Sequence, residues 1–294
     1  MLATSAITGK TKIVGVIGHP IGHSLSPAMQ NAAFTALGLD YCYVAFDVSP
    51  DDIPAALAGM RALNIVGFNV TIPHKPVVFR LVDRLDNSAQ MVEAVNTVRY
   101  DAKGMVGYST DAEGFVRPLE SLGISLADKR IVIIGAGGAA RSVAAACLNR
   151  GAGSIVVLNR TPEKGRELVD RLKRLAQPAA GHLPVLDAIQ LKIGQAAVSE
   201  ADLLVQCTSV GMSPLQDAPP PISPAWIRPD SVVYDLIYNP AETRLLAAAR
   251  AIGATTINGV DMLVQQGAVA FQIWTGIDPP VDVMRRALLN GLGR

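Results

Sequence analysis

Apolar and polar positions along the chain alternate in the way that is typical of an α/β protein. Apolar runs rich in β-branched residues, typical of strands buried in a sheet, occur at residues 12–18, 41–48, 66–72, 131–134, 154–158, 202–207, 231–237 and 255–257. Segments with helical spacing lie between them, at residues 26–37, 51–64, 76–83, 89–95, 111–123, 138–149, 163–176, 243–252, 259–276 and 281–292. This order predicts an α/β fold with largely parallel sheets.

Two local signals refine this pattern. Residues 101–104, Asp-Ala-Lys-Gly, are typical of a hairpin turn between strands at 96–100 and 105–110. Ser26 precedes Pro27, and this pair predicts a helix with Ser26 as its N-cap and proline in its first turn.

A glycine-rich turn follows the apolar run at 131–134. Gly135, Gly137 and the small residue Ala140 occupy the three fixed places of a G-x-G-x-x-G/A pattern. The first glycine allows a tight turn, the second lets the backbone approach a pyrophosphate, and the small residue lets the helix pack closely on the strand. The helix N-terminus would then face the anion. A glycine-rich turn without a ligand is the alternative, but strand, helix, turn and strand in succession favour a dinucleotide site.

The end of the next strand bears on the choice of dinucleotide. An NAD-binding protein usually has Asp or Glu there, and this chain has Asn159, followed by Arg160 and Lys164. No carboxylate repels a 2′-phosphate at this point, and two cations could hold one, so the sequence favours NADP. The alternative is that both cations are solvated residues at a helix start, with Glu163 nearby.

Three loops in the first part of the chain carry polar residues at strand ends, where open α/β sheets hold their ligands. They are Ser24-Leu-Ser26, Asn69-Val-Thr-Ile-Pro-His-Lys75, and the two ends of the hairpin, Asn96-Thr97 and Ser109-Thr-Asp111. Each alone is typical of a cap or a turn. Polar side chains on a buried face need partners. Together, the three loops predict a pocket for a small polyhydroxylated molecule.

Composition narrows the classes of function. A formal net charge of +1 over 294 residues indicates neither a nucleic-acid partner nor an acidic membrane surface, and no apolar run approaches a membrane span. The first residues lack an apolar signal core, so we expect a cytoplasmic enzyme without a secretory signal. The 3 cysteines lie far apart without metal-ligand spacing, so we expect buried thiols and no metal site.

Taken in order, these motifs resemble the shikimate/quinate dehydrogenase family over essentially the full chain. The matching segments are Ser24-Leu-Ser-Pro27, Asn69-Val-Thr-Ile-Pro-His-Lys75, Ala94-Val-Asn-Thr97, Ser109-Thr-Asp111, Gly135-Ala-Gly-Gly-Ala139, Asn159-Arg-Thr161, Tyr238-Asn-Pro240 and Met262-Leu-Val-Gln-Gln266. The resemblance implies an oxidoreductase that reversibly reduces 3-dehydroshikimate to shikimate with NADPH, in the chorismate pathway of aromatic amino-acid biosynthesis. It also implies a substrate-binding catalytic domain over 1–112, a Rossmann NADP-binding domain over 113–258, and helices over 259–294 that return to the first domain.

The resemblance further implies a role for each matched residue. Lys75 and Asp111 would be the catalytic pair. The substrate would be bound by Ser24, Ser26, Asn69, Thr71, Asn96, Tyr238 and Gln266. The cofactor would be bound by Gly135, Ala136, Gly137, Gly138, Ala139, Asn159, Arg160, Thr161, Lys164, Thr208, Leu236 and Gly259. Lys164 stands where many NADP-specific members carry arginine, and Ser26 is typical of the shikimate-specific members.

The chemistry is consistent with these roles. Hydride reduction of a ring ketone produces an alkoxide, which must receive a proton as it forms, and a lysine ammonium oriented by Asp111 could supply it. His23 and His74 are interpreted as structural or rim residues. Two alternatives stay open: a dual-specificity quinate/shikimate enzyme that uses NAD or NADP, and a catalytically silent nucleotide-binding sensor. We expect a monomer or a homodimer with a small-molecule substrate.

Overall fold

The computed structural model describes residues 7–176 and 183–293. The chain forms two compact units, which we call the first unit (Met1–Gly114 with Val264–Arg294) and the second unit (Phe115–Leu263). Each boundary falls inside a helix, the first in α5 (Asp111–Ser121) and the second in α10 (Val260–Thr275). The first unit is therefore built from both ends of the chain, whereas the second is one continuous segment.

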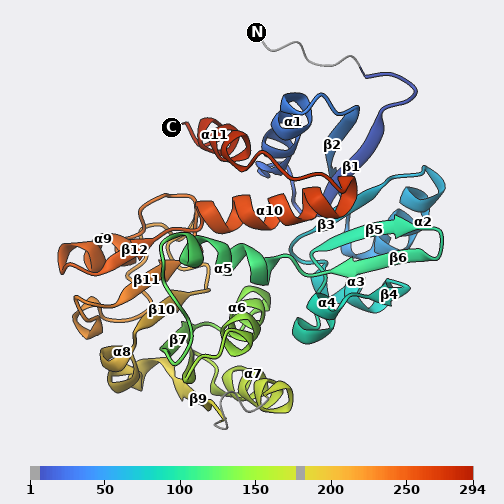
Figure 1. Ribbon diagram of the computed structural model, residues 1–294. Helices are drawn as coiled ribbons and strands as arrows, with labels where there is room; N and C mark the ends of the chain where they lie inside the picture. The colour runs from blue at the N-terminus through green and yellow to red at the C-terminus, as the bar shows by residue number, and fades with distance from the viewer. Residues whose placement is uncertain (1–6, 177–182, 294) are drawn as a thin grey trace. The chain divides into compact units, whose positions relative to one another are not determined.

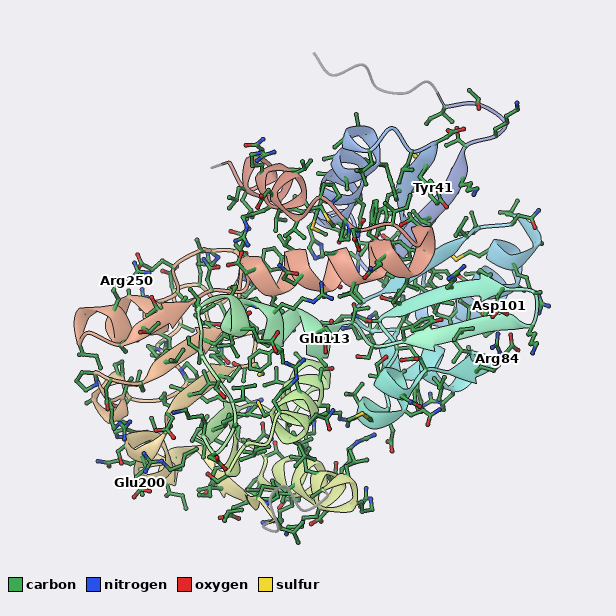
Figure 2. The ribbon with its side chains drawn as sticks, viewed as in Figure 1. Tyr41, Arg84, Asp101, Glu113, Glu200 and Arg250 are labelled. Atoms are coloured by element: carbon green, nitrogen blue, oxygen red, sulfur yellow. The ribbon has the colours of Figure 1, made fainter. Side chains whose placement is uncertain are left out.

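The first unit contains a mixed six-stranded sheet in the order β2-β1-β3-β5-β6-β4 (Figure 1). Its strands are β1 (Lys12–Gly18), β2 (Tyr41–Asp47), β3 (Gly67–Val70), β4 (Arg84–Leu85), β5 (Thr97–Asp101) and β6 (Gly104–Tyr108). Strand β1 runs parallel to both β2 and β3, while β3 and β5 are antiparallel. The predicted hairpin is confirmed, because Asp101 pairs with Gly104 at its turn. Arg84 Nη2 contacts both carboxylate oxygens of Asp101 at 2.5 Å, beside this turn (Figure 2).

Helices of the first unit come from both parts of the chain. They are α1 (Ser26–Ala36), α2 (Ile53–Ala62, after the short 3-10 turn Pro50–Asp52), α3 (Lys75–Leu81), α4 (Asn87–Val92) and α11 (Val281–Gly291). Helix α11 packs against α1. Gln30 Nε2 donates to the Gly267 carbonyl at 2.9 Å, and Trp274 Nε1 donates to the Val98 carbonyl at 3.0 Å. These two bonds attach the C-terminal segment to the sheet and to α1.

The strands of the first unit carry few polar residues because many of their side chains are buried in one apolar core. Ile17, Phe68, Val70, Val78 and Val98 belong to one buried cluster. Gly67 is required by this packing, because a Cβ there would lie 2.3 Å from the Val98 carbonyl oxygen and 2.5 Å from Trp274 Nε1. Without a side chain at residue 67, the indole comes close enough to donate its hydrogen bond to the strand.

The second unit contains a wholly parallel sheet in the order β12-β11-β10-β7-β8-β9. Its strands are β7 (Arg130–Ile134), β8 (Ser154–Asn159), β9 (Val185–Gln190), β10 (Leu203–Gln206), β11 (Val232–Asp235) and β12 (Thr255–Ile257). Its helices include α6 (Gly138–Asn149), α7 (Pro162–Leu175), α8 (Gln195–Glu200) and α9 (Arg244–Ala251). Successive strands run outward from β7 on one side and outward from β10 on the other. This doubly wound order is that of the dinucleotide-binding Rossmann fold, so the predicted fold class is confirmed.

Two expectations need correction or extension. Strand β9 and helix α8 were not predicted, because Asp187 and Gln190 interrupt the apolar residues of Val185–Gln190 and α8 has only 6 residues. Cys147 is buried as expected, but Cys42 and Cys207 are only partly buried, and all three thiols are free. Among the described residues, none of the helices combines the length and the apolar character needed to cross a bilayer.

Candidate active site

Lys75 and Asp111 are brought together in the first unit although they lie far apart in the sequence. Lys75 is the first residue of α3 and Asp111 is the first residue of α5. Lys75 Nζ donates to Asp111 Oδ2 at 2.6 Å, and the two side chains are 24% and 12% exposed. A carboxylate suits the first turn of a helix, but an ammonium there is opposed by the helix dipole. The local structure therefore accounts for Asp111 and gives Lys75 no advantage of its own.

Asn96 holds the other oxygen of the Asp111 carboxylate. Its amide nitrogen donates to Asp111 Oδ1 at 2.7 Å and to Thr110 Oγ1 at 2.9 Å. Its Oδ1 accepts from the backbone N–H of Thr110 at 2.8 Å. Asn96 is buried and directly precedes β5, so the hairpin places it beside the start of α5. Asp111 is thus oriented from both sides, by Lys75 and by Asn96.

Asn69 on β3 forms a second layer of the same network. Tyr43 Oη donates to Asn69 Oδ1 at 2.7 Å. The Asn69 amide nitrogen donates to the Asn96 carbonyl at 3.2 Å and to Thr97 Oγ1 at 2.9 Å. Both amide hydrogens are therefore used inside the protein, and only lone-pair capacity on Oδ1 is left for a ligand.

The serine loop before α1 differs from its expected capping geometry. The N-cap of α1 is Leu25, without a side-chain cap, and Ser26 is already the first helical residue, so the predicted capping role of Ser26 is wrong. Instead, Ser24 Oγ accepts from the backbone N–H of Ser26 at 3.3 Å. Both serines are half-buried, as is Thr71, which directly follows β3.

Two histidines near this site differ in their burial. His74 is buried, and its Nε2 lies 2.8 Å from the Val48 carbonyl oxygen, which confirms its structural interpretation. His23 is exposed in the loop before α1.

Gln266 and Tyr238, expected to bind the substrate, belong to different units. Gln266 lies in the part of α10 that belongs to the first unit, where both it and Gln265 are half-buried. Tyr238 lies in the second unit, after β11, and burial raises the pKa of its phenol.

The glycine loop of the second unit connects β7 to α6. Gly135 has φ +106°, in the region that favours glycine, and a Cβ there would approach the Thr208 methyl to 3.1 Å. A Cβ on Gly137 or on Gly138 would meet nothing within 4 Å. Packing therefore does not require glycine at these two positions, where α6 begins without a side-chain cap. Open backbone at a helix N-terminus fits a bound phosphate group.

The segment after β8 presents cations. Asn159 Nδ2 donates to the Thr161 carbonyl at 2.7 Å, which shapes the turn into α7 and leaves Arg160 and Lys164 exposed. Glu163, the acid that could have paired with them, contacts Arg166 Nη2 at 2.6 Å instead. Arg160 also borders a cavity of about 560 Å³, whose other lining residues are Gln190, Leu191, Lys192, Pro219, Pro220, Pro221, Ile222, Ser223, Pro224 and Trp226.

Two buried polar residues that the sequence analysis did not single out shape the neighbouring loops. Gln206 accepts from the Thr208 backbone N–H at 2.6 Å and donates to the Val210 carbonyl at 3.0 Å. Asp235 accepts from Thr243 Oγ1 at 2.7 Å and from the Ile237 backbone N–H at 3.1 Å. Burial raises the pKa of Asp235 to about 6, and these two hydrogen bonds partly oppose the rise. In the sequence, Gln206 and Asp235 could have been recognised because each is a polar residue at the end of an apolar strand.

Gly259 has a specific steric role among the expected cofactor residues. A Cβ at this position would lie 2.0 Å from the Leu236 carbonyl oxygen, so no other residue fits. The start of α10 and the loop after β11 therefore approach each other closely. The described residues contain no group of three or more His, Cys, Asp or Glu side chains that could hold a metal ion.

Comparison with known proteins identifies the family. The family model for the shikimate dehydrogenase substrate binding domain matches residues 16–98, and the model for shikimate/quinate 5-dehydrogenase matches residues 119–214. The model for the shikimate 5'-dehydrogenase C-terminal domain matches residues 259–289. A shikimate dehydrogenase (NADP(+)) from Moorella thermoacetica is 47% identical, over 100% of this chain and 97% of its own length. The chain belongs to the shikimate dehydrogenase family.

Solved structures of the family agree with this assignment. A shikimate dehydrogenase crystallised in complex with NADP+ is 43% identical, covers 98% of both chains and gives a TM-score of 0.90. The Listeria monocytogenes shikimate 5-dehydrogenase, in complex with shikimate and NAD, is 35% identical, covers 97% of this chain and 99% of its own, and also gives 0.90. The family and the oxidoreductase class predicted from the sequence are thereby confirmed.

Proposed function

We propose that this protein is an NADP-dependent shikimate dehydrogenase, which reversibly reduces 3-dehydroshikimate to shikimate in aromatic amino-acid biosynthesis. The observation that carries the proposal is the contact of 2.6 Å between Lys75 and Asp111 inside a polar network. The helix dipole does not stabilise a lysine ammonium at the first residue of a helix, so a catalytic role is the better explanation of its position. The relatives named above support the choice of substrate and cofactor.

In this reaction Lys75 donates a proton to the carbonyl oxygen of the substrate as that oxygen becomes an alkoxide. NADPH, when bound, supplies the hydride. Asp111 and Asn96 fix the direction in which the ammonium points, since the carboxylate is bonded on both oxygens. In the reverse direction the neutral lysine amine takes the hydroxyl proton of shikimate. Positioning of this kind lowers the barrier because the proton donor is already aligned before the reaction begins.

The substrate would lie against the polar residues of the same network. Ser24 and Ser26 are hydroxyl donors at the start of α1 and suit a carboxylate, which accepts strong hydrogen bonds. Asn69, Thr71 and Asn96 would face the ring and its hydroxyl groups. Gln266 and Tyr238 would complete the substrate contacts, as the family resemblance implies.

The cofactor would be held by the second unit. Its pyrophosphate would lie on residues 135–139, Gly-Ala-Gly-Gly-Ala, where two glycines leave the backbone uncovered. Arg160 and Lys164, with Asn159 and Thr161, would bind the 2′-phosphate and the adenosine. Both cations are exposed, and Glu163 is engaged with Arg166, which supports NADP over NAD. Thr208, Leu236 and Gly259 would contact the remaining part of the dinucleotide.

We therefore assign the proton donor and the substrate contacts other than Tyr238 to the first unit, and NADP to the second. The expected domain limits of 112 and 258 lie close to the boundaries of these units. We also propose a cytoplasmic enzyme that acts as a monomer or a homodimer. Light scattering of the purified protein distinguishes the two oligomeric states.

The deciding experiment follows the oxidation of NADPH spectrophotometrically. The protein is mixed with 3-dehydroshikimate and NADPH, then with NADH in place of NADPH, and then with 3-dehydroquinate in place of the substrate. Turnover confined to NADPH and 3-dehydroshikimate supports the proposal. Comparable rates with NADH or 3-dehydroquinate would replace it with dual specificity. Binding of NADPH without turnover of either substrate would replace it with a silent nucleotide-binding protein.

A further inference from the structure

Tyr43 on β2 is held rigidly in the core of the first unit. Its side chain is 2% exposed. Its backbone N–H donates to Asn31 Oδ1 at 2.8 Å, and its carbonyl accepts from Asn31 Nδ2 at 2.9 Å. Its ring packs against Trp274 with 5.9 Å between the ring centroids. The position of the phenol oxygen is therefore fixed by backbone and ring together.

The phenol of Tyr43 reaches a strand that is not its neighbour. In the sheet, Tyr43 pairs with Val14 of β1, and Asn69 of β3 pairs with Val16 of β1. Since Val14 and Val16 are two positions apart on one strand, Tyr43 and Asn69 point to the same face of the sheet. The phenol spans β1 on that face and donates to Asn69 Oδ1 at 2.7 Å.

From Asn69 the hydrogen bonds run without a break to the catalytic pair. Asn69 Nδ2 donates to Thr97 Oγ1 at 2.9 Å, and Thr97 Oγ1 donates to Asn96 Oδ1 at 3.1 Å. Asn96 Nδ2 then donates to Asp111 Oδ1, and Lys75 donates to the other carboxylate oxygen. Every donor on the way from Tyr43 points toward Asp111.

This series of hydrogen bonds keeps its direction only if its first residue, Tyr43, is a donor. The oxygen of a carboxamide accepts and its nitrogen donates, so the Tyr43 hydroxyl fixes which end of Asn69 faces β2. Burial raises the pKa of Tyr43, which favours the protonated phenol that donates to Asn69. Tyr43 is therefore the first donor of the series that ends at Asp111.

We propose that Tyr43 is a positioning residue for the reaction. Through Asn69, Thr97 and Asn96 it orients the Asp111 carboxylate that holds Lys75. The phenol is buried and touches neither reacting atom, so its effect passes entirely through these partners. The inference rests on the proposed roles of Lys75 and Asp111.

The test replaces Tyr43 with phenylalanine in the full chain, which removes one oxygen and keeps the ring. Tyr100→Phe is the matched control, because Tyr100 Oη donates to the Leu57 carbonyl at 2.9 Å in the same unit. Turnover of shikimate with NADP+ is measured for both variants, with the melting temperature as a check on folding. We expect kcat of Tyr43→Phe to fall roughly tenfold, the equivalent of one well-placed hydrogen bond, with the KM for NADP+ unchanged. We expect Tyr100→Phe to stay within about twofold of the wild type.

A double-mutant cycle separates positioning from a general loss of packing. If Tyr43 acts through the carboxylate, its replacement in an Asp111→Asn background should change kcat by less than about twofold. A roughly tenfold loss in that background would overturn the proposal. So would an equal loss of kcat in Tyr100→Phe.

A Lys75→Ala variant identifies which conclusion fails. Full activity of Lys75→Ala would overturn the proposed roles of the catalytic pair, and this inference with them. An inactive Lys75→Ala beside a Tyr43→Phe of normal kcat would overturn this inference alone.

Discussion

Replacing Asp235 with asparagine should remove a pH-dependent loss of stability. The carboxylate is fully buried at the end of β11 and accepts from Thr243 Oγ1 and from the Ile237 backbone N–H. Asparagine has nearly the same shape. Its oxygen can accept from Ile237, and its NH₂ can donate to the Thr243 hydroxyl, so both contacts survive in a neutral form.

The magnitude follows from the shift in the pKa. Burial raises the pKa of Asp235 from 3.8 to about 6 in the folded protein. Its contribution to stability is complete below the unfolded pKa, where both states are protonated. It is lost as the pH rises through the folded pKa, because the unfolded state ionises first. A shift of about 2 pKa units corresponds to a loss of ~3 kcal/mol between the acidic and neutral limits.

The assay is urea unfolding of the wild type and of Asp235→Asn at several pH values between about 4 and 8. The other titrating groups contribute equally to both proteins, so the difference between the two free energies of unfolding isolates Asp235. We expect that difference to grow in favour of the variant by ~2–3 kcal/mol across this range, mostly below about pH 6.5. Parallel curves, with a constant difference at every pH, would refute the reasoning.

Three other changes test the proposed sites. Lys75→Ala should lower kcat by about 10²–10⁴-fold while the KM for shikimate rises much less, and near-normal kcat with a large KM effect would reject the role in proton transfer. Arg160→Ala should raise the KM for NADPH about tenfold or more and leave the KM for NADH unchanged. The control is Arg166→Ala, which removes a cation that is already paired with Glu163 and should change neither KM. Gly137→Ala should keep the wild-type melting temperature, because a Cβ at this position meets nothing within 4 Å. It should weaken NADP binding in a fluorescence titration, because the side chain would cover the backbone that approaches the pyrophosphate. Unchanged NADP binding would show that the loop is not part of the cofactor site.

The second unit was the more predictable part of the fold. Residues 131–134 are apolar without alternation, and a strand with both faces buried in a parallel sheet is the arrangement that satisfies them. Of the glycines that follow, Gly135 has the positive φ of a tight turn, as the spacing predicts. Strand β9 was missed because an edge strand is covered less completely and Val185–Gln190 mixes polar with apolar residues.

The candidate active site was predictable only as a set of polar loops. Lys75 and Asp111 are separated by 36 positions, and no periodicity relates two residues at different helix starts. Their pairing came from the family resemblance. Ser26 was mistaken for a cap because the sequence does not show that the helix already begins there, with Leu25 before it. Tyr43 resembled an ordinary core aromatic, since its partner lies two strands away in a register that only the folded sheet defines.

The division of the chain also sets an order for its synthesis. Phe115–Leu263 is contiguous, so its parallel sheet can form as soon as that segment has left the ribosome. The first unit is completed later, because Trp274 and Gly267, which bond to Val98 and Gln30, follow that segment in the chain. Until they are made, the Val98 carbonyl and the Gln30 amide lack these partners. The half that carries Lys75 and Asp111 is therefore begun before the other half and completed after it.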